Sequence, residues 1–333
     1  MQKQIPVITI FAPTACGKTA LATRFFGKSS LSRFKGMGEL ISADSQAVYQ
    51  KMNIGTAKAD ESTKRELPHH MIDLLTPDIQ FGAGEFVTRA DSYVQEIWSR
   101  GRFPLLVGGT GFYIRNFLLG LSKAPESNLQ IRSKIKERMT VEGNKKLYYE
   151  LKSVDPVYAK RIHINDEYRI IRALEVYYST GKALSSYGEN DQLRSQYDFA
   201  TIILTRDRKE LYERIDQRVE EMFKEGLPEE VQKLVKEGYD FNSPGMKAIG
   251  YSEFFDSQSG VLRNDLENIK NEIKHHSHRY AKRQYTFMRD IPGAVTIHAD
   301  DEDTFCRVLE NFCSKYMSMK QNFPNHPLPG EGL

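Results

Sequence analysis

The chain has few cysteines, no long apolar run and little net charge. Its 333 residues include three cysteines, Cys16, Cys306 and Cys313. They are too few and too scattered for a disulfide framework, so we expect a reducing, cytoplasmic compartment. No apolar segment approaches the length that crosses a bilayer, and the N-terminus lacks a signal-peptide pattern, so we expect no membrane partner. The net charge of +3 means that nucleic-acid binding must come from local patches.

Zinc-binding patterns are also missing. The histidines of the segment 275–278 match no zinc spacing, and no Cys/His zinc finger is present. The same segment continues to Tyr285 as a basic helix face with aromatic residues, which favours either an RNA contact or a solvated helix. His69 and His70 are interpreted as a structural loop pair.

A phosphate-binding loop is the most informative motif that is present. Residues 12–19 read Ala-Pro-Thr-Ala-Cys-Gly-Lys-Thr and follow the apolar run 7–11. A strand, a tight loop and a helix start in this order hold phosphates with backbone N–H groups and the helix N-terminus. Lys18 supplies charge for the outer phosphates, and the Thr19 hydroxyl is placed to ligate Mg²⁺. Ala12 replaces the first glycine of the motif, which requires a negative φ there.

The apolar runs predict an α/β fold, a P-loop NTPase-like parallel sheet with helices on both faces. They lie at 7–11, 39–43, 104–107, 199–204 and 294–298. Because ligands of such sheets bind beyond the carboxyl ends of the strands, the segments that follow three of these runs should meet in one crevice. These segments are the phosphate loop, Asp44-Ser45 and Gly108–Gly111.

Strand signals disappear between residues 120 and 199, where helical patterns cover 128–139, 145–153 and 165–178. We therefore predict a catalytic α/β core over 1–122 and 197–316 and a helical insertion over 123–196. The Pro- and Gly-rich tail, 317–333, is predicted to be disordered.

Asp44 is the main candidate for chemistry outside the loop. A carboxylate at a strand end beside a phosphate loop can bind Mg²⁺ or accept a proton from an attacking group, and the alternative is a cap for the next helix. Ser45 and Gln46 suit hydrogen bonds to a base edge. The glycines of 108–111 either let a ligand approach the backbone, with Thr110 bonding it, or simply form a tight turn.

Two arginines, Arg214 and Arg218, stand four residues apart on one side of a predicted helix. Paired guanidinium groups suit a diphosphate. The alternative is structural pairing with nearby acids, namely Glu210, Glu213 and Asp216.

Taken in order, these motifs resemble the tRNA dimethylallyltransferase (tRNA isopentenyltransferase) family, in its bacterial form because the C-terminal zinc finger is absent. The resemblance covers about residues 5–290 and is carried by the segments 13–19, 41–49, 54–58, 68–73, 108–113, 206–218, 225–227, 246–251 and 280–284. Two departures are Ala12 and Ala47, the latter at a position where many members have Gln.

The resemblance implies transfer of a dimethylallyl group from dimethylallyl diphosphate to the N6 amine of an adenosine. That adenosine lies immediately 3′ of the anticodon in tRNAs that read codons beginning with U. The implied cofactor is Mg²⁺, ligated by Thr19 with or without Asp44, and the implied catalytic residues are Asp44, Thr19 and Lys18. Diphosphate is implied to bind Thr14, Ala15, Cys16, Gly17, Lys18, Thr19, Arg214 and Arg218, without a choice between the two arginines.

The implied partner is the tRNA anticodon stem-loop, embraced by the insertion of a protein that we expect to be a monomer. The implied tRNA contacts are Asp44, Ser45, Gln46, Ala47, Thr110, Arg132, Asn165, Asp166, Glu167, Tyr168, Arg169, Met246, Lys247, Ala248, Ile249, Gly250 and Tyr251.

Three alternatives stay open at this point. A small-molecule kinase of the P-loop class would need a γ-phosphoryl acceptor site and an arginine-rich lid. An isopentenyltransferase that acts on free adenine nucleotides would need no RNA-embracing insertion. A non-catalytic RNA-binding module is disfavoured by the intact Gly17-Lys18-Thr19 and by Asp44.

Overall fold

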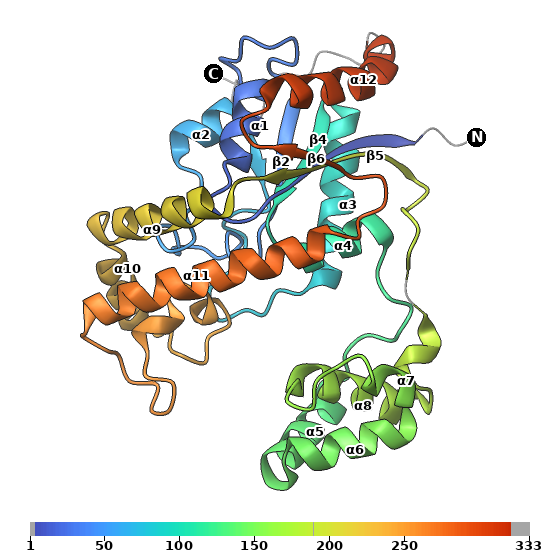
Figure 1. Ribbon diagram of the computed structural model, residues 1–333, viewed down its shortest axis with the longest axis vertical. Helices are drawn as coiled ribbons and strands as arrows, with labels where there is room; N and C mark the ends of the chain where they lie inside the picture. Colours follow the sequence, from blue (N-terminus) through green and yellow to red (C-terminus); the bar gives the residue numbers. More distant parts are fainter. Residues whose placement is uncertain (1–3, 189, 321–333) are drawn as a thin grey trace. The chain divides into compact units, whose positions relative to one another are not determined.

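The computed structural model describes residues 4–188 and 190–320. The chain forms two compact units, an α/β unit up to Leu118 and from Leu193 onward, and a helical unit over Leu119–Gln192 (Figure 1). The helical unit thus begins and ends four residues before the predicted insertion. The last helix, α12 (Glu302–Lys320), includes the predicted start of the tail at 317, so that boundary was wrong. The rest of the tail prediction lies outside the described residues.

The predicted parallel sheet is confirmed. Its six strands follow the order β3-β2-β4-β1-β5-β6, and every pairing between them is parallel. The strands are β1 (Ile5–Phe11), β2 (Gly38–Ala43), β3 (His69–His70), β4 (Phe103–Gly108), β5 (Tyr197–Thr205) and β6 (Val295–His298). The loop prediction for His69 and His70 was wrong, because both pair with β2 as a short edge strand.

Both faces of the sheet are covered, as the continuous apolar strands require. On one face, Ile8 and Ile10 of β1 share a buried cluster with α1 (Lys18–Phe26), α9 (Arg208–Lys224) and α12. The alternate β1 residues, Val7 and Phe11, are also fully buried and point to the other face. There α3 (Ala83–Ser99) packs against β1, β2 and β4.

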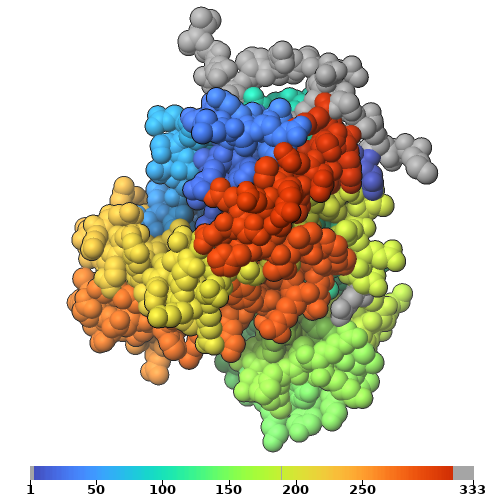
Figure 2. All heavy atoms as spheres, turned by 45° about the horizontal axis from the view of Figure 1, so that its top comes forward, coloured from blue at the N-terminus to red at the C-terminus, as the bar shows by residue number. Residues whose placement is uncertain are grey.

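Four further helices complete the described part of the α/β unit. They are α2 (Glu61–Glu66), α4 (Gly111–Leu119), α10 (Leu227–Lys236) and α11 (Leu266–Met288), with short 3-10 turns at Gly245–Lys247 and Ser252–Phe254. Helices α9 and α11 pack against each other and lie side by side (Figure 1 and Figure 2).

The helical unit has a core of its own. It consists of α5 (Leu129–Glu142), α6 (Asn144–Val154), α7 (Pro156–Ala159) and α8 (Glu167–Thr180), with a 3-10 turn at Leu184–Tyr187. Its buried centre includes Ile135, Leu147, Leu151, Ile170 and Leu174. Across all the described residues, no helix combines the length and the apolar character needed to span a membrane.

Candidate active site

A cavity of about 290 Å³ opens beyond the carboxyl ends of β1 and β2. It collects nine of the predicted site residues: Thr14, Lys18, Asp44, Ser45, Gln46, Arg218, Lys247, Ala248 and Ile249. The other lining residues come from the loop 55–57 and from one face each of α9 and α11: Gly55, Thr56, Ala57, Ile215, Val219, Met222, Ile273, Ser277, Tyr280, Arg283 and Gln284. Two of the three segments predicted to form a crevice, the phosphate loop and Asp44-Ser45, thus line the cavity, whereas none of residues 108–111 is among its lining residues.

The phosphate loop has two left-handed residues, Gly17 (φ 98°) and Ala15 (φ 59°). Ala12 is fully buried and is not among the positive-φ residues, so its expected negative φ is confirmed. Two loop N–H groups already have protein acceptors: that of Thr14 donates to Gln284 Oε1 (3.0 Å), and that of Cys16 to the Pro13 carbonyl (3.3 Å). The first N–H groups of α1 lack intrahelical partners and stay available to an anion.

Two arginines hold the loop from its outer carbonyls. Arg214 Nε donates to the carbonyl of Ala15 (3.0 Å), and Arg206 Nε donates to that of Cys16 (2.9 Å). Burial raises the pKa of the Cys16 thiol to about 11, so this cysteine is a packing residue and not a nucleophile. Arg214 thus has a structural partner in the loop itself.

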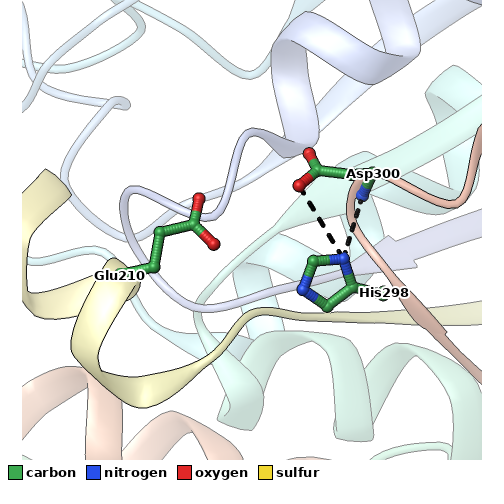
Figure 3. Close-up of side chains that lie close together, drawn as sticks. All are labelled: Glu210, His298 and Asp300. Atoms are coloured by element: carbon green, nitrogen blue, oxygen red, sulfur yellow. Dashed lines mark hydrogen bonds and ion pairs between the residues drawn. The ribbon is translucent and has the colours of Figure 1, made fainter.

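Near these arginines, Glu210, His298 and Asp300 lie close together (Figure 3). Their ligand atoms are near enough to one another for a metal ion. However, Arg206 pairs with both carboxylates, at 2.5 Å to Glu210 and 2.7 Å to Asp300. The cluster therefore serves to fix Arg206 against the phosphate loop.

Arg218 and Lys18 differ from Arg206 and Arg214. Both are half-buried and line the cavity, and within the described chain neither has an ion pair. Burial lowers the pKa of Lys18 and of Arg218, and the neighbouring charge of Arg214 lowers that of Arg218 further. An anion bound beside Lys18 and Arg218 would raise both pKa values again, because it favours the charged form of each side chain.

The charge of the cavity wall is strongly unequal. Four cationic side chains line it, namely Lys18, Arg218, Lys247 and Arg283, whereas Asp44 is the one acid among the described lining residues. Such a wall suits a ligand with several negative charges.

Asp44 follows β2 directly. Its Oδ1 accepts hydrogen bonds from the backbone N–H groups of Gln46 (2.8 Å) and Ala47 (3.4 Å), so it caps a turn and not the predicted helix. Thr110 Oγ1 accepts the N–H of Ser45 (3.0 Å) and holds this turn in place. The buried Oε1 of Gln46 has no hydrogen-bond partner in the described part of the chain, so it can accept from a ligand.

The glycines after β4 are required by packing within the protein. A Cβ on Gly108 would lie 2.1 Å from the Ala43 carbonyl oxygen, and one on Gly109 would lie 2.3 Å from Gln284 Nε2. Neither glycine has a positive φ. The interpretation that these two glycines are needed for conformational freedom was therefore wrong, whereas close approach of a ligand to this backbone stays a prediction.

Several predicted tRNA contacts have side chains that RNA cannot reach. Met246 and Tyr251 are fully buried, and the Tyr251 hydroxyl donates to Glu230 (2.6 Å). Ala47 is also buried. These three are core residues that shape the loops, and the tRNA contacts predicted for their loops stay predictions. Gly250, with φ 98°, packs against Gly55.

Thr19 is the second residue of α1 and is not among the described lining residues of the cavity, so its predicted contact with Mg²⁺ or diphosphate stays a prediction.

In the helical unit, the predicted contacts fall into two groups. Arg132 is mostly buried, pairs with Glu175 (3.0 Å) and lies over the Tyr168 ring (5.0 Å). Asp166 caps α8 by accepting the Arg169 N–H (3.2 Å). Tyr168 and Arg169 are exposed. The remaining predicted residues have local partners, since Asn165 donates its N–H to His163 and Glu167 accepts from Asn144.

Sequence reasoning missed the link that α11 makes to the phosphate loop. Besides bonding to Thr14, the buried Gln284 donates through Nε2 to the Gly109 carbonyl (2.6 Å). Burial, together with the Asp44 charge, raises the pKa of the neighbouring Tyr280 to about 12. The available signal was the spacing of Ile273, Ser277, Tyr280 and Gln284, which puts all four on one helix face.

Comparisons with known proteins identify relatives of this chain. A family model described as IPP transferase matches residues 47–291. The chain is 39% identical to a tRNA dimethylallyltransferase of Thermoanaerobacter sp. over 96% of this chain and 99% of that protein. It is 42% identical to tRNA dimethylallyltransferase 2 of Geotalea daltonii, over 88% and 87%.

Two solved structures extend the likeness to the fold. The tRNA isopentenylpyrophosphate transferase of Bacillus halodurans matches with a TM-score of 0.64 at 32% identity, covering 97% of this chain and all of that one. A eukaryotic dimethylallyltransferase described as acting on tRNA gives a TM-score of 0.74 at 25% identity, over 99% of this chain and 82% of that one. From the sequence motifs, the cavity and these matches together, we conclude that the chain belongs to the IPP transferase family.

Proposed function

We propose that this protein transfers the dimethylallyl group of dimethylallyl diphosphate to the N6 amine of the adenosine 3′-adjacent to the anticodon in tRNAs reading codons that begin with U. The observation that carries this proposal is the composition of the cavity wall. Lys18 and Arg218, which have no ion pair in the described parts 4–188 and 190–320, line the cavity with Asp44, and the aliphatic residues of α9 and α11 line it too. A diphosphate ester of a short hydrocarbon chain matches both halves of such a wall.

The reaction breaks the C1–O bond of the allylic substrate and forms a bond from C1 to the adenosine N6. Diphosphate leaves with the electron pair of the broken bond, and Lys18, Arg218 and the N-terminus of α1 stabilise its growing charge. Asp44 accepts the proton that N6 releases. The free Oε1 of Gln46 can accept the other N6 hydrogen and thereby orient the amine.

Mg²⁺ is the proposed cofactor, because the donors beside the diphosphate site are hard oxygen atoms. The Asp44 carboxylate and the hydroxyls of Thr14 and Ser45 line the cavity, and Thr19 lies at the start of α1. A site with one carboxylate and substrate phosphates suits this ion. When bound, Mg²⁺ would neutralise charge on the leaving diphosphate.

The proposed RNA partner is the tRNA anticodon stem-loop. Its target base must leave the base stack to reach the allylic carbon. Within the α/β unit, the exposed Lys247 and Arg283 suit contacts with RNA phosphates. Within the helical unit, the exposed Tyr168 and Arg169 offer a stacking surface and a charge. The aliphatic wall fits a hydrocarbon group better than the polar acceptor substrate that the kinase alternative requires.

A direct assay tests the proposal. The full-length protein is incubated with labelled dimethylallyl diphosphate, Mg²⁺ and unmodified tRNA, and the digested RNA is searched for prenylated adenosine. Parallel reactions contain free AMP in place of tRNA, or ATP in place of the allylic substrate. Label that appears in the adenosine of the tRNA but not in AMP supports the proposal. Label in AMP would favour the free-nucleotide enzyme, and tRNA-stimulated ATP consumption would favour the kinase.

A further inference from the structure

The aliphatic part of the cavity lies between one face of α9 and one face of α11. On α9, Ile215, Val219 and Met222 are spaced so that they share a face, and all three are buried. On α11, the buried Ile273 shares a face with Gln284. The two helices therefore form facing walls for the same space.

Both walls are anchored at the phosphate loop and extend away from it. Arg214 of α9 and Gln284 of α11 each hydrogen-bond to the backbone of that loop. Met222 lies eight residues beyond Arg214, or about 12 Å along the helix, and Ile273 lies eleven residues before Gln284, or about 16 Å. Among the described lining residues of the two helices, Met222 and Ile273 are thus the farthest from the phosphates.

The helices are fastened together at this level. Lys270 and Lys274 of α11 both pair with Glu220 of α9, at 3.1 and 2.6 Å. Phe223 of α9 stacks on Phe254, with ring centroids 6.1 Å apart, and Phe254 belongs to the 3-10 turn Ser252–Phe254, which packs against α11. The helices cannot spread easily here, so a longer ligand would meet Met222 and Ile273 directly.

We propose that Met222 and Ile273 form the end wall of the prenyl site and limit the transferred chain to one isoprene unit. This inference rests on the proposed function, because it assumes that the diphosphate sits at the phosphate loop. A second isoprene unit would have to occupy the volume of these two side chains, and a close-packed wall resists such overlap. Truncating both residues removes about as many heavy atoms as one isoprene unit adds.

The test compares dimethylallyl with geranyl diphosphate as donors to one tRNA anticodon stem-loop. The kcat/KM of each donor is measured for the wild type, Met222→Ala, Ile273→Ala, the double variant and the milder Ile273→Val. We expect the geranyl-to-dimethylallyl ratio to rise about tenfold or more in each alanine variant, because one methylene contact discriminates by at least that factor. The double variant should show the largest rise and Ile273→Val the smallest.

Ile269→Ala is the matched control. Ile269 is equally buried on α11, one turn away, and is not among the cavity residues that the structure describes. Its ratio should equal that of the wild type. Because both donors are assayed on the same preparation, a partly unfolded variant changes both rates and leaves the ratio intact.

Three results would overturn the end-wall assignment. They are an unchanged ratio in the double variant, an equal rise in Ile269→Ala, and an effect confined to the KM for tRNA, which would place the adenosine against this wall. A wild type that transfers no dimethylallyl group would instead refute the proposed function, and it is recognised from the wild-type reaction alone.

Discussion

Strand β2 has an acidic residue near each end, and the two acids have opposite surroundings. Glu39, at its start, is completely buried and contacts His70 and Arg100 at 2.7 Å each and Arg102 at 3.6 Å. Asp44, directly after its end, lines a cavity and accepts hydrogen bonds from the backbone. At the first end the protein itself supplies the opposite charges, whereas at the second end the four wall cations have no ion pair within the residues that the structure describes.

The difference indicates that the start of β2 contributes to stability, whereas its end contributes to function. A buried charge with protein partners is costly to disturb but has no capacity left for a ligand. A cation cluster without partners destabilises the free protein and becomes favourable when an anion binds. The cationic side chains at the carboxyl end of the sheet can therefore still bind an anionic ligand, whereas the charged groups at the opposite end are paired with one another.

The largest effect is expected from Asp44→Asn. The amide keeps the shape of the side chain and can still accept the Gln46 N–H, but it cannot accept the proton from N6. Transfer should slow by about 10²–10⁴ at saturating substrates, as expected for loss of a general base. tRNA affinity and thermal stability should stay close to wild type. More than a third of the wild-type turnover in this variant would rule out Asp44 as the base.

The next effect separates the two arginines of α9. Arg218→Ala removes an unpaired cation from the cavity, and we expect kcat to fall by about 10²–10³, the usual loss for one preorganised charge donor. Arg214→Ala removes a contact with the loop carbonyl and should cost clearly less. Steady-state rates at several dimethylallyl diphosphate concentrations measure both variants. Equal losses would mean that both guanidinium groups contact the diphosphate.

The fold was largely predictable because the strands are apolar on both faces. Continuous apolar runs identify such strands directly, and the helical unit follows from their absence. The edge strand β3 was missed because His69 and His70 are polar and form only two pairings. The short β3 is held by its neighbour β2, and no local pattern reports such a partner.

The site was less predictable because the role of a charged side chain depends on which groups contact it in the folded protein. Arg214 and Arg218 look alike in sequence, yet only one lines the cavity. Met246 and Tyr251 belong to a family motif, yet they are core residues. Gln284 reaches the phosphate loop across 270 positions of sequence, and the spacing on its helix indicates a shared face but not this partner.

The structural end of β2 should affect stability and not catalysis. Although burial alone would raise it, hydrogen bonds from His70 and Arg100 lower the pKa of Glu39 to about 2. A carboxyl group with a lowered folded-state pKa stabilises the protein above its unfolded pKa of 4.5, and the contribution is lost as the pH falls towards 2. The shift corresponds to about 3 kcal/mol of unfolding free energy.

Glu39→Gln should therefore lower the unfolding free energy at pH 7 by about 3 kcal/mol and flatten its decline between pH 5 and pH 2 by about the same amount. Denaturant titrations at several pH values measure both effects. Glu61→Gln is the control, because Glu61 is exposed and pairs only at the surface with Lys64. If the unfolding free energy of Glu39→Gln declined between pH 5 and pH 2 as steeply as that of the wild type, the buried cluster would not govern acid stability.

The smallest effect extends the same comparison to the helical unit. Arg132 pairs with the buried Glu175, as Glu39 pairs within the core, whereas the exposed Arg169 pairs at the surface with Asp166 (3.1 Å). If Arg169 neutralises one tRNA phosphate, Arg169→Ala should reduce the slope of log affinity against log salt by about 0.7–0.9. Arg132→Ala should leave this slope unchanged and lower the melting temperature, because Glu175 loses a partner. Binding isotherms with an anticodon stem-loop at four salt concentrations decide between them, and a slope change in Arg132→Ala alone would reverse the assignment. Such a reversal would mean that RNA opens the Arg132–Glu175 pair on binding, so that an internal partner would no longer mark an arginine as structural.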